Sequence, residues 1–429
     1  MFRPSLSATP PQRALGRNLG LDLFAAIGVG ATVAVVTALL PTIGRRGGLE
    51  PIGLAALAAA PFVANLLSVF AGRVGPRSPG QLAAIRGGGA ASLLVLAVVT
   101  SAPVLIAVSL VYWLSLSLSG PFQLRLWGAM YPPRLRGRIV GTIGSGKAAA
   151  AVVAALIGGL AADQFGGPAA MLVAGAIGAV CAIGYAGLRA PTAERPKGFS
   201  ARDSIRALRE RSVLSRLAFA QGFYGGGLIA AAPLYAIVNV DRLDLSMADV
   251  GILAILSAAS NTLAFLVWGV VADRRGPILA MRVGALLGLG SLVAYALAPD
   301  VRVLYAASAA AGIAGASIDV GIAAVISDQT TLASRAAAMA GWNALTGARG
   351  IVAAFAMSIL LQAGLVDVTT GLLLCAVVSA VGVALFWRTD LLEHADDRER
   401  RPMRTRVLAP IVPSRFGRAV AELRSAVAR

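Results

Sequence analysis

Five ionisable side chains within long apolar runs of this chain are candidates for function. They are Asp22, Arg125, Lys147, Asp319 and Arg349. A charge within an apolar run of membrane length is costly, so each of these residues is a functional-site hypothesis by default. A carboxylate that exchanges between a basic partner and a proton can couple a process to a proton gradient. Buried basic groups can instead hold an anion.

The spacing leaves several pairings open. Asp319 lies on a helical face of small residues, and the next apolar run carries Arg349, so these two side chains can pair. In the first half, Asp22 can pair with Arg125 or with Lys147. A third reading is that the charges form buried ion pairs that only fix helix packing. We expect the set to line a cavity, together with residues on the same face as Arg349. The cavity and coupling candidates are Asp22, Arg125, Lys147, Asp319, Trp342, Thr346 and Arg349.

A short phrase occurs twice, each time at the end of an apolar run. One copy spans Ser68–Pro76 and the other Gly269–Pro277. Glycine permits close packing and a tight reversal. Asp273 is placed to accept free amide hydrogens at the start of a neighbouring helix. The first copy has Gly72 at the matching position, so a latch there would have to use Arg73 or Arg77 with another partner.

We therefore predict a gate in which Asp273 holds the start of the run at 138–162, with Arg138 as an ion partner. The alternative is that Asp273 and Arg274 only end a helix at a membrane surface. Because Gly72 removes the anion from the first copy, the two halves should not gate alike. The gate candidates are Arg73, Gly75, Arg138, Gly269, Asp273, Arg274 and Gly276.

The elements that carry these residues are apolar runs of membrane length. The chain is 57% hydrophobic and 14% charged, and a spanning helix needs roughly 20 mostly apolar residues. The sequence predicts an all-α polytopic membrane protein with no metal site. Its twelve predicted spans are 19–42, 50–72, 80–101, 104–129, 138–162, 168–189, 213–238, 247–271, 279–298, 301–327, 336–361 and 367–388.

The net charge of +18 does not indicate a nucleic-acid-binding protein. Most Lys and Arg residues fall in the tails and in alternate loops, which is the bias typical of the cytoplasmic side of a membrane. We therefore expect a multi-pass protein of the inner (cytoplasmic) membrane, with both termini on the cytoplasmic side. Attraction to anionic membrane lipid is a second effect of the same charge.

A polar, basic stretch divides the spans into six and six. We expect an N-terminal cytoplasmic tail at 1–18, a first bundle at 19–190 and a central loop at 191–212. A second bundle then covers 213–390, and a basic tail covers 391–429. The end of that tail is either an amphipathic helix on the inner leaflet or a disordered segment.

Six plus six spans, a basic central loop and the phrase Gly269-x-x-x-Asp273-Arg274-x-Gly276 resemble the major facilitator superfamily of secondary transporters. The resemblance covers roughly residues 18–390. It implies two pseudo-symmetric six-helix bundles that rock about a central cavity, giving alternating access. It also implies a protein that works as a monomer on a small solute. The Gly72 position departs from the family pattern.

Residues that would support an enzyme, a cofactor or a metal are few. Cys181 and Cys375 lie in predicted spans and are expected to be buried apolar side chains. His394 is the sole histidine. The segment Gly141–Ala148 resembles a phosphate-binding loop, but Ala148 stands where magnesium binding needs Ser or Thr. We predict no enzyme activity and no cofactor.

The sequence thus predicts a secondary active transporter that moves a small solute across the cytoplasmic membrane, coupled to protons. Export of a drug-like or metabolite solute is favoured over uptake. The alternatives are an uptake permease, an uncoupled facilitator, or a membrane sensor or scaffold that transports nothing.

Overall fold

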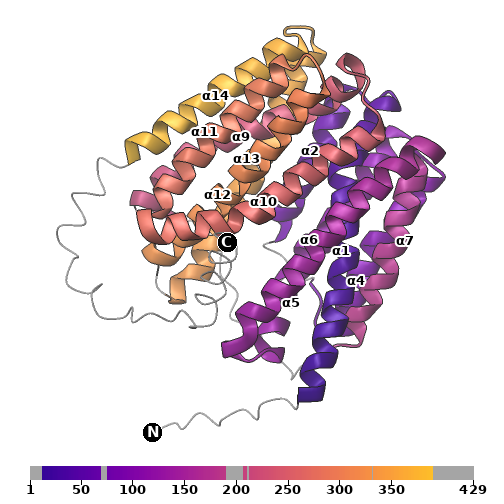
Figure 1. Ribbon diagram of the computed structural model, residues 1–429, viewed down its shortest axis with the longest axis vertical. Coiled ribbons are helices and arrows are strands. Elements are labelled where there is room, and N and C mark those ends of the chain that lie inside the picture. Colours follow the sequence, from indigo (N-terminus) through magenta and orange to yellow (C-terminus); the bar gives the residue numbers. More distant parts are fainter. Residues whose placement is uncertain (1–11, 69–74, 190–205, 210–211, 331, 390–429) are drawn as a thin grey trace, which may run out of the picture. The chain divides into compact units, whose positions relative to one another are not determined.

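The computed structural model describes residues 12–68, 75–189, 206–209, 212–330 and 332–389. The described residues up to Phe386 belong to one compact unit, and residues 387–389 fall outside it. Long helices account for most of the described residues, and no strand occurs among them. Figure 1 shows these helices coloured along the chain.

The first half contributes six helical segments. They are α1 (Gln12–Arg46), α2 (Pro51–Leu67), α4 (Pro79–Ala91) with its 3-10 continuation η2 (Ser92–Ala97), α5 (Ala102–Met130), α6 (Pro133–Phe165) and α7 (Gly167–Ala186).

The second half repeats this pattern. Its segments are α9 (Ser212–Ile237) with the π-helical turn η3 (Val238–Arg242), α10 (Met247–Arg275), α11 (Pro277–Leu297), α12 (Val301–Gln329), α13 (Leu332–Gln362) and α14 (Val368–Arg388).

All twelve predicted spans coincide with these segments. Eleven are long and apolar enough to cross a membrane. The twelfth, α2, is apolar but shorter in its described part, because residues 69–74 lie outside the described ranges. The prediction of a twelve-helix, all-α membrane protein built as two six-helix bundles is confirmed. The proposed domain limits at 190 and 390, and the form of the basic tail, concern residues outside the described ranges and stay predictions.

Local sequence explains where the helices turn. Ser246 caps α10 in a capping box with Asp249, and proline occupies the first turn of α4, α6 and α11. Between α10 and α11 the chain reverses at Gly276, which has φ +94°. A side chain would be strained in that conformation, so the second copy of the repeated phrase makes the tight reversal expected of it.

The two halves meet mainly along two pairs of helices, α2 with α13 and α6 with α10. Glycine allows these backbones to approach closely. Gly251 of α10 lies against the Ala155 carbonyl of α6, and Gly347 of α13 lies against the Phe62 carbonyl of α2. In a membrane, helices associate through such close packing of small residues. The contacts also fix which helix ends of the two halves lie near each other.

Candidate functional site

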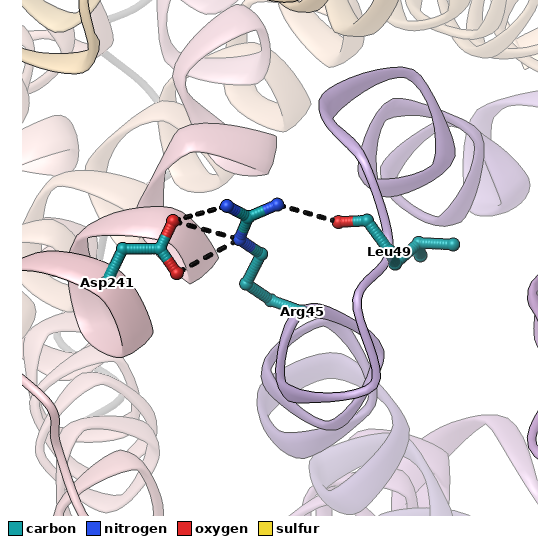
Figure 2. A network of polar contacts seen from close by, with 3 residues as sticks. All are labelled: Arg45, Leu49 and Asp241. Atoms are coloured by element: carbon teal, nitrogen blue, oxygen red, sulfur yellow. Dashed lines mark hydrogen bonds and ion pairs between the residues drawn. The ribbon is translucent and has the colours of Figure 1, made fainter.

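Polar bridges join the two halves at one end of the helices. This end, which we call the bridged end, comprises the C-terminal ends of α1, α6 and α13 and the start of α10. Arg45, at the end of α1, forms an ion pair with Asp241 of η3. The Arg45 Nε lies 3.0 Å from both Asp241 oxygens, and its Nη1 donates to the Leu49 carbonyl at 3.1 Å (Figure 2). The guanidinium thus ties the first half to the second.

Asp163 makes a second bridge at this end. It lies in the last turn of α6, and its two carboxylate oxygens accept the amide hydrogens of Met247 and Ala248 at 2.7 and 2.8 Å. These are the first two residues of α10, whose amides have no partner within the helix. A carboxylate there also complements the positive end of the helix dipole. Asp163 therefore caps a helix of the opposite half.

Two further contacts complete the bridged end. Gln362, at the end of α13, donates to the Glu50 carboxylate at 2.7 Å and accepts from the Ile52 amide at 3.0 Å. Arg46 donates to the Leu245 carbonyl at 2.5 Å. Both contacts again join the two halves. Glu50, Ile52 and Arg46 belong to the first half, and Gln362 and Leu245 belong to the second.

We expect the Arg45–Asp241 pair to contribute little on its own. Both side chains are partly exposed, and an exposed ion pair is worth about 0–1 kcal/mol. Replacing Arg45 by glutamine should lower the midpoint of thermal unfolding by no more than a few degrees, which corresponds to a loss of about 1 kcal/mol in the free energy of unfolding. Exchanging the two residues, as Arg45→Asp with Asp241→Arg, should restore the midpoint. A double variant less stable than either single variant would contradict this pairing.

The opposite end, called here the motif end, carries the two copies of the repeated phrase. Between described residues, neither a hydrogen bond nor an ion pair connects the halves there. Asp273, Arg274 and Arg138 are exposed, and Gly269, Gly75 and Gly276 are half-buried. Arg73 lies outside the described residues. The predicted contact of Asp273 with the start of α6 is not made in this conformation, and its role in gating stays a prediction.

Arg138 instead lines a cavity at the motif end between α1 and α6. Leu15 and Leu19 contribute from α1, and Ile139 and Thr142 contribute from α6. The alternative, that Asp273 only ends a helix at the membrane surface, also stays a prediction.

In the first half, Asp22 is fully buried within α1. Its Oδ2 accepts hydrogen bonds from Trp127 Nε1 at 2.6 Å and from Tyr131 Oη at 3.0 Å, while its Oδ1 has no partner. Tyr131 lies between α5 and α6. Burial and the Asp22 carboxylate raise the pKa of its phenol, so the hydroxyl keeps its proton and donates to Asp22. Neither Arg125 nor Lys147 forms an ion pair with Asp22, contrary to the pairing that their order suggested.

The basic candidates of the first half have other surroundings. The Arg125 guanidinium lies 5.3 Å from the centre of the Phe122 ring, and Lys147 is exposed on α6. A guanidinium over an aromatic ring gains from the ring quadrupole. Both residues lie on helices that also contact α1.

Sequence reasoning missed Arg86, a buried arginine of α4. Its guanidinium donates to Ser119 Oγ at 2.5 Å and to Gln123 Oε1 at 3.0 Å. Gln123 Nε2 in turn donates to the Tyr185 hydroxyl at 3.2 Å. Arg86 lies within the predicted span 80–101, so the criterion that selected the other five charges applied to it equally.

In the second half, Arg349 of α13 donates to the Gln221 carbonyl of α9 at 2.5 Å. Asp319 of α12 is exposed and forms no ion pair with Arg349, so this predicted pair is not present. Trp342 packs into a hydrophobic cluster that includes Tyr224, and Thr346 is half-buried. The structure brings Arg349 close to α9 and leaves Asp319 apart from it.

Twelve helical segments in two bundles, eleven of them long and apolar enough to cross a membrane, define a polytopic membrane protein. A sequence model described as Major Facilitator Superfamily matches residues 22–301 and 217–427. These ranges cover most of the chain, so the chain belongs to the major facilitator superfamily. This confirms the resemblance seen in the sequence. A search of curated proteins gives no significant match.

Solved transporters share the fold at low sequence identity. A mutant of the nucleoside transporter NupG has a TM-score of 0.72 and 15% identity, covering 87% of this chain and 100% of that one. A bacterial homologue of the human lysosomal transporter Spinster, inward-facing and unoccupied, has a TM-score of 0.70 and 15% identity, covering 90% and 99%. The peptide transporter POT with sulfate has 0.67 and 14%, covering 89% and 95%. At such identities the likeness shows the fold alone.

Proposed function

We propose that this chain moves a small solute across the cytoplasmic membrane by alternating access, driven by protons. One observation carries the proposal: polar bridges join the two halves at one end of the helices. A carrier that closes its two ends in turn has such bridges at one end in each of its end states. Membership of a transporter superfamily supports the same reading.

The distribution of Lys and Arg supports an orientation with both termini in the cytoplasm of the inner membrane. The motif end then faces the cytoplasm, and the bridged end faces outward. In that orientation the conformation is closed on the extracytoplasmic side. A single chain contains both bundles, so we propose that it works as a monomer surrounded by lipid.

Asp22 is the proposed proton site. It is fully buried on α1, one of the helices that contact the other half, and it forms no ion pair. An uncompensated carboxylate is costly within a membrane, so gain and loss of a proton would change the energy of this conformation. Its free Oδ1 leaves a position where that proton can bind. Trp127 and Tyr131 hold the other oxygen in either protonation state.

Flux into proteoliposomes under an imposed pH gradient tests this function. Gradient-driven movement of one member of a broad solute panel would support it, and the direction of that movement relative to the protons separates export from uptake. Export is the direction we propose. Movement that ignores the gradient would identify an uncoupled facilitator, and no flux for any solute would favour a sensor or scaffold.

Asp273→Asn should shift the protein toward the conformation described here. Asp273 is exposed and bridges nothing in this state, so its replacement costs nothing here, while a latch on α6 in the opposite state would be lost. Losing a carboxylate at a helix N-terminus costs about 1 kcal/mol, or about fivefold in population. Val98 and Leu365 are exposed positions at the bridged end, one in each half. Spin labels on Val98→Cys and Leu365→Cys should show a larger population with the short label-to-label distance of the closed bridged end. An unchanged distance distribution would leave Asp273 as a helix-end residue.

A further inference from the structure

Two buried polar atoms without a hydrogen-bond partner occur close together in the second half. They are Oε1 of Gln221 on α9 and Nε of Arg349 on α13. Gln221 is only 8% exposed. Buried acceptors and donors are almost always paired in folded proteins, so these two groups are positioned to bind polar atoms of a ligand. One atom requires a donor and the other an acceptor.

The charge of Arg349 is uncompensated among the described residues. Its Nη1 donates to the Gln221 carbonyl, and no described carboxylate lies within ion-pair distance. A guanidinium in the membrane interior is expensive unless an anion neutralises it. Its planar array of donors matches a carboxylate, which can accept two parallel hydrogen bonds.

Gly225 lets these two groups lie directly against the backbone of α9. A Cβ atom at Gly225 would lie 3.0 Å from the guanidinium carbon and Nη2 of Arg349, and 3.0 Å from Nε2 of Gln221. Both polar groups therefore rest against a bare stretch of α9 backbone. Even a methyl group there would push them from their present positions.

We propose that Arg349, Gln221 and Gly225 form a subsite for a carboxylate flanked by a hydrogen-bond donor, as in an α-hydroxy acid. The carboxylate accepts from Arg349 Nε and a neighbouring guanidinium nitrogen, and the adjacent hydroxyl donates to Gln221 Oε1. The subsite rests on the proposed transport function, because it names the class of solute that the carrier would take. It satisfies both unpaired atoms and the uncompensated charge together.

Thermal unfolding of the purified protein with three matched probes tests the subsite. Mandelate has the carboxylate and the hydroxyl, phenylacetate lacks the hydroxyl, and mandelamide lacks the charge. Mandelate should raise the melting temperature in proportion to its binding. Phenylacetate should bind about tenfold more weakly, as expected for one lost hydrogen bond, and mandelamide should produce no shift. Absence of a mandelate shift, or an equal shift with mandelamide, would overturn the proposal.

Gly225→Ala tests whether this position contributes to the subsite, and Gly222→Ala is the matched control. Alanine favours the helix at both positions, so both variants should fold. A Cβ at Gly222 meets nothing within 4 Å, so mandelate binding should be unchanged there, whereas Gly225→Ala should weaken it about tenfold. Unweakened binding to Gly225→Ala would refute the subsite.

This measurement needs no membrane gradient, so the two proposals can fail separately. Mandelate binding without any flux in proteoliposomes would count against transport and leave the subsite in place. Flux of other solutes without mandelate binding would count against the subsite alone.

Discussion

Replacement of Asp22 by asparagine should abolish proton-driven accumulation of the solute. Asparagine keeps an oxygen that can accept from Trp127 and Tyr131, but it cannot bind and release a proton. With one proton per solute, a pH difference of two units supports about hundredfold accumulation, because each unit is worth about 1.4 kcal/mol. The variant should accumulate no solute beyond equilibrium, as measured in proteoliposomes.

Exchange without net driving force separates this loss from misfolding. Asp22→Asn should still exchange labelled for unlabelled solute across the membrane, since that process needs no proton. Asp319→Asn is the matched control, because Asp319 is a membrane carboxylate that forms no ion pair with any described residue. Its replacement should leave accumulation intact. Loss of coupling in Asp319→Asn with normal coupling in Asp22→Asn would move the proton site to α12.

Asp163→Asn should open the bridged end. The Asp163 carboxylate accepts two amide hydrogens from the start of α10, and asparagine retains one acceptor and no charge. Because Asp163 is exposed, we expect a loss of about 1 kcal/mol, which is about fivefold in population. Labels on Val98→Cys and Leu365→Cys would then report more of the long distance, which is the opposite of the shift expected for Asp273→Asn.

Asp300→Asn provides a control of the same chemistry within one half. Asp300 accepts from the amides of Arg302 and Val303 at the start of α12, so it caps a helix without bridging the bundles. Its replacement should lower the melting temperature and leave the label distances unchanged. Equal distance changes in Asp163→Asn and Asp300→Asn would mean that the shift reflects lost stability, with no latch at Asp163.

These two carboxylates, Asp163 and Asp273, lie at the C-terminal ends of α6 and α10. The two helices pair between the halves, so each carboxylate lies toward the first turn of the other helix. In this conformation the Asp163 contact is made and the Asp273 contact is not. We therefore expect the two contacts to alternate as the ends open and close. The asymmetry that Gly72 predicts at the motif end is untested, because residues 69–74 lie outside the described ranges.

The sequence by itself determined the architecture. Runs of about twenty apolar residues leave a chain few choices in a membrane, because every backbone polar group must be satisfied within a helix. It also identified the reversal at Gly276 and most of the membrane charges, since both follow from local residue type. Arg86 was within reach of the same reasoning and was overlooked.

The partners of those charges were decided by the tertiary structure. Asp22 contacts Trp127 and Tyr131, and Arg349 contacts the Gln221 backbone, although sequence order suggested ion pairs for both. Asp163 looked like a helix-end residue until packing placed it against α10. Sequence fixes the height of a residue along its helix, but rotation and neighbour choice depend on how helices pack. Only the folded protein therefore reveals which end is bridged.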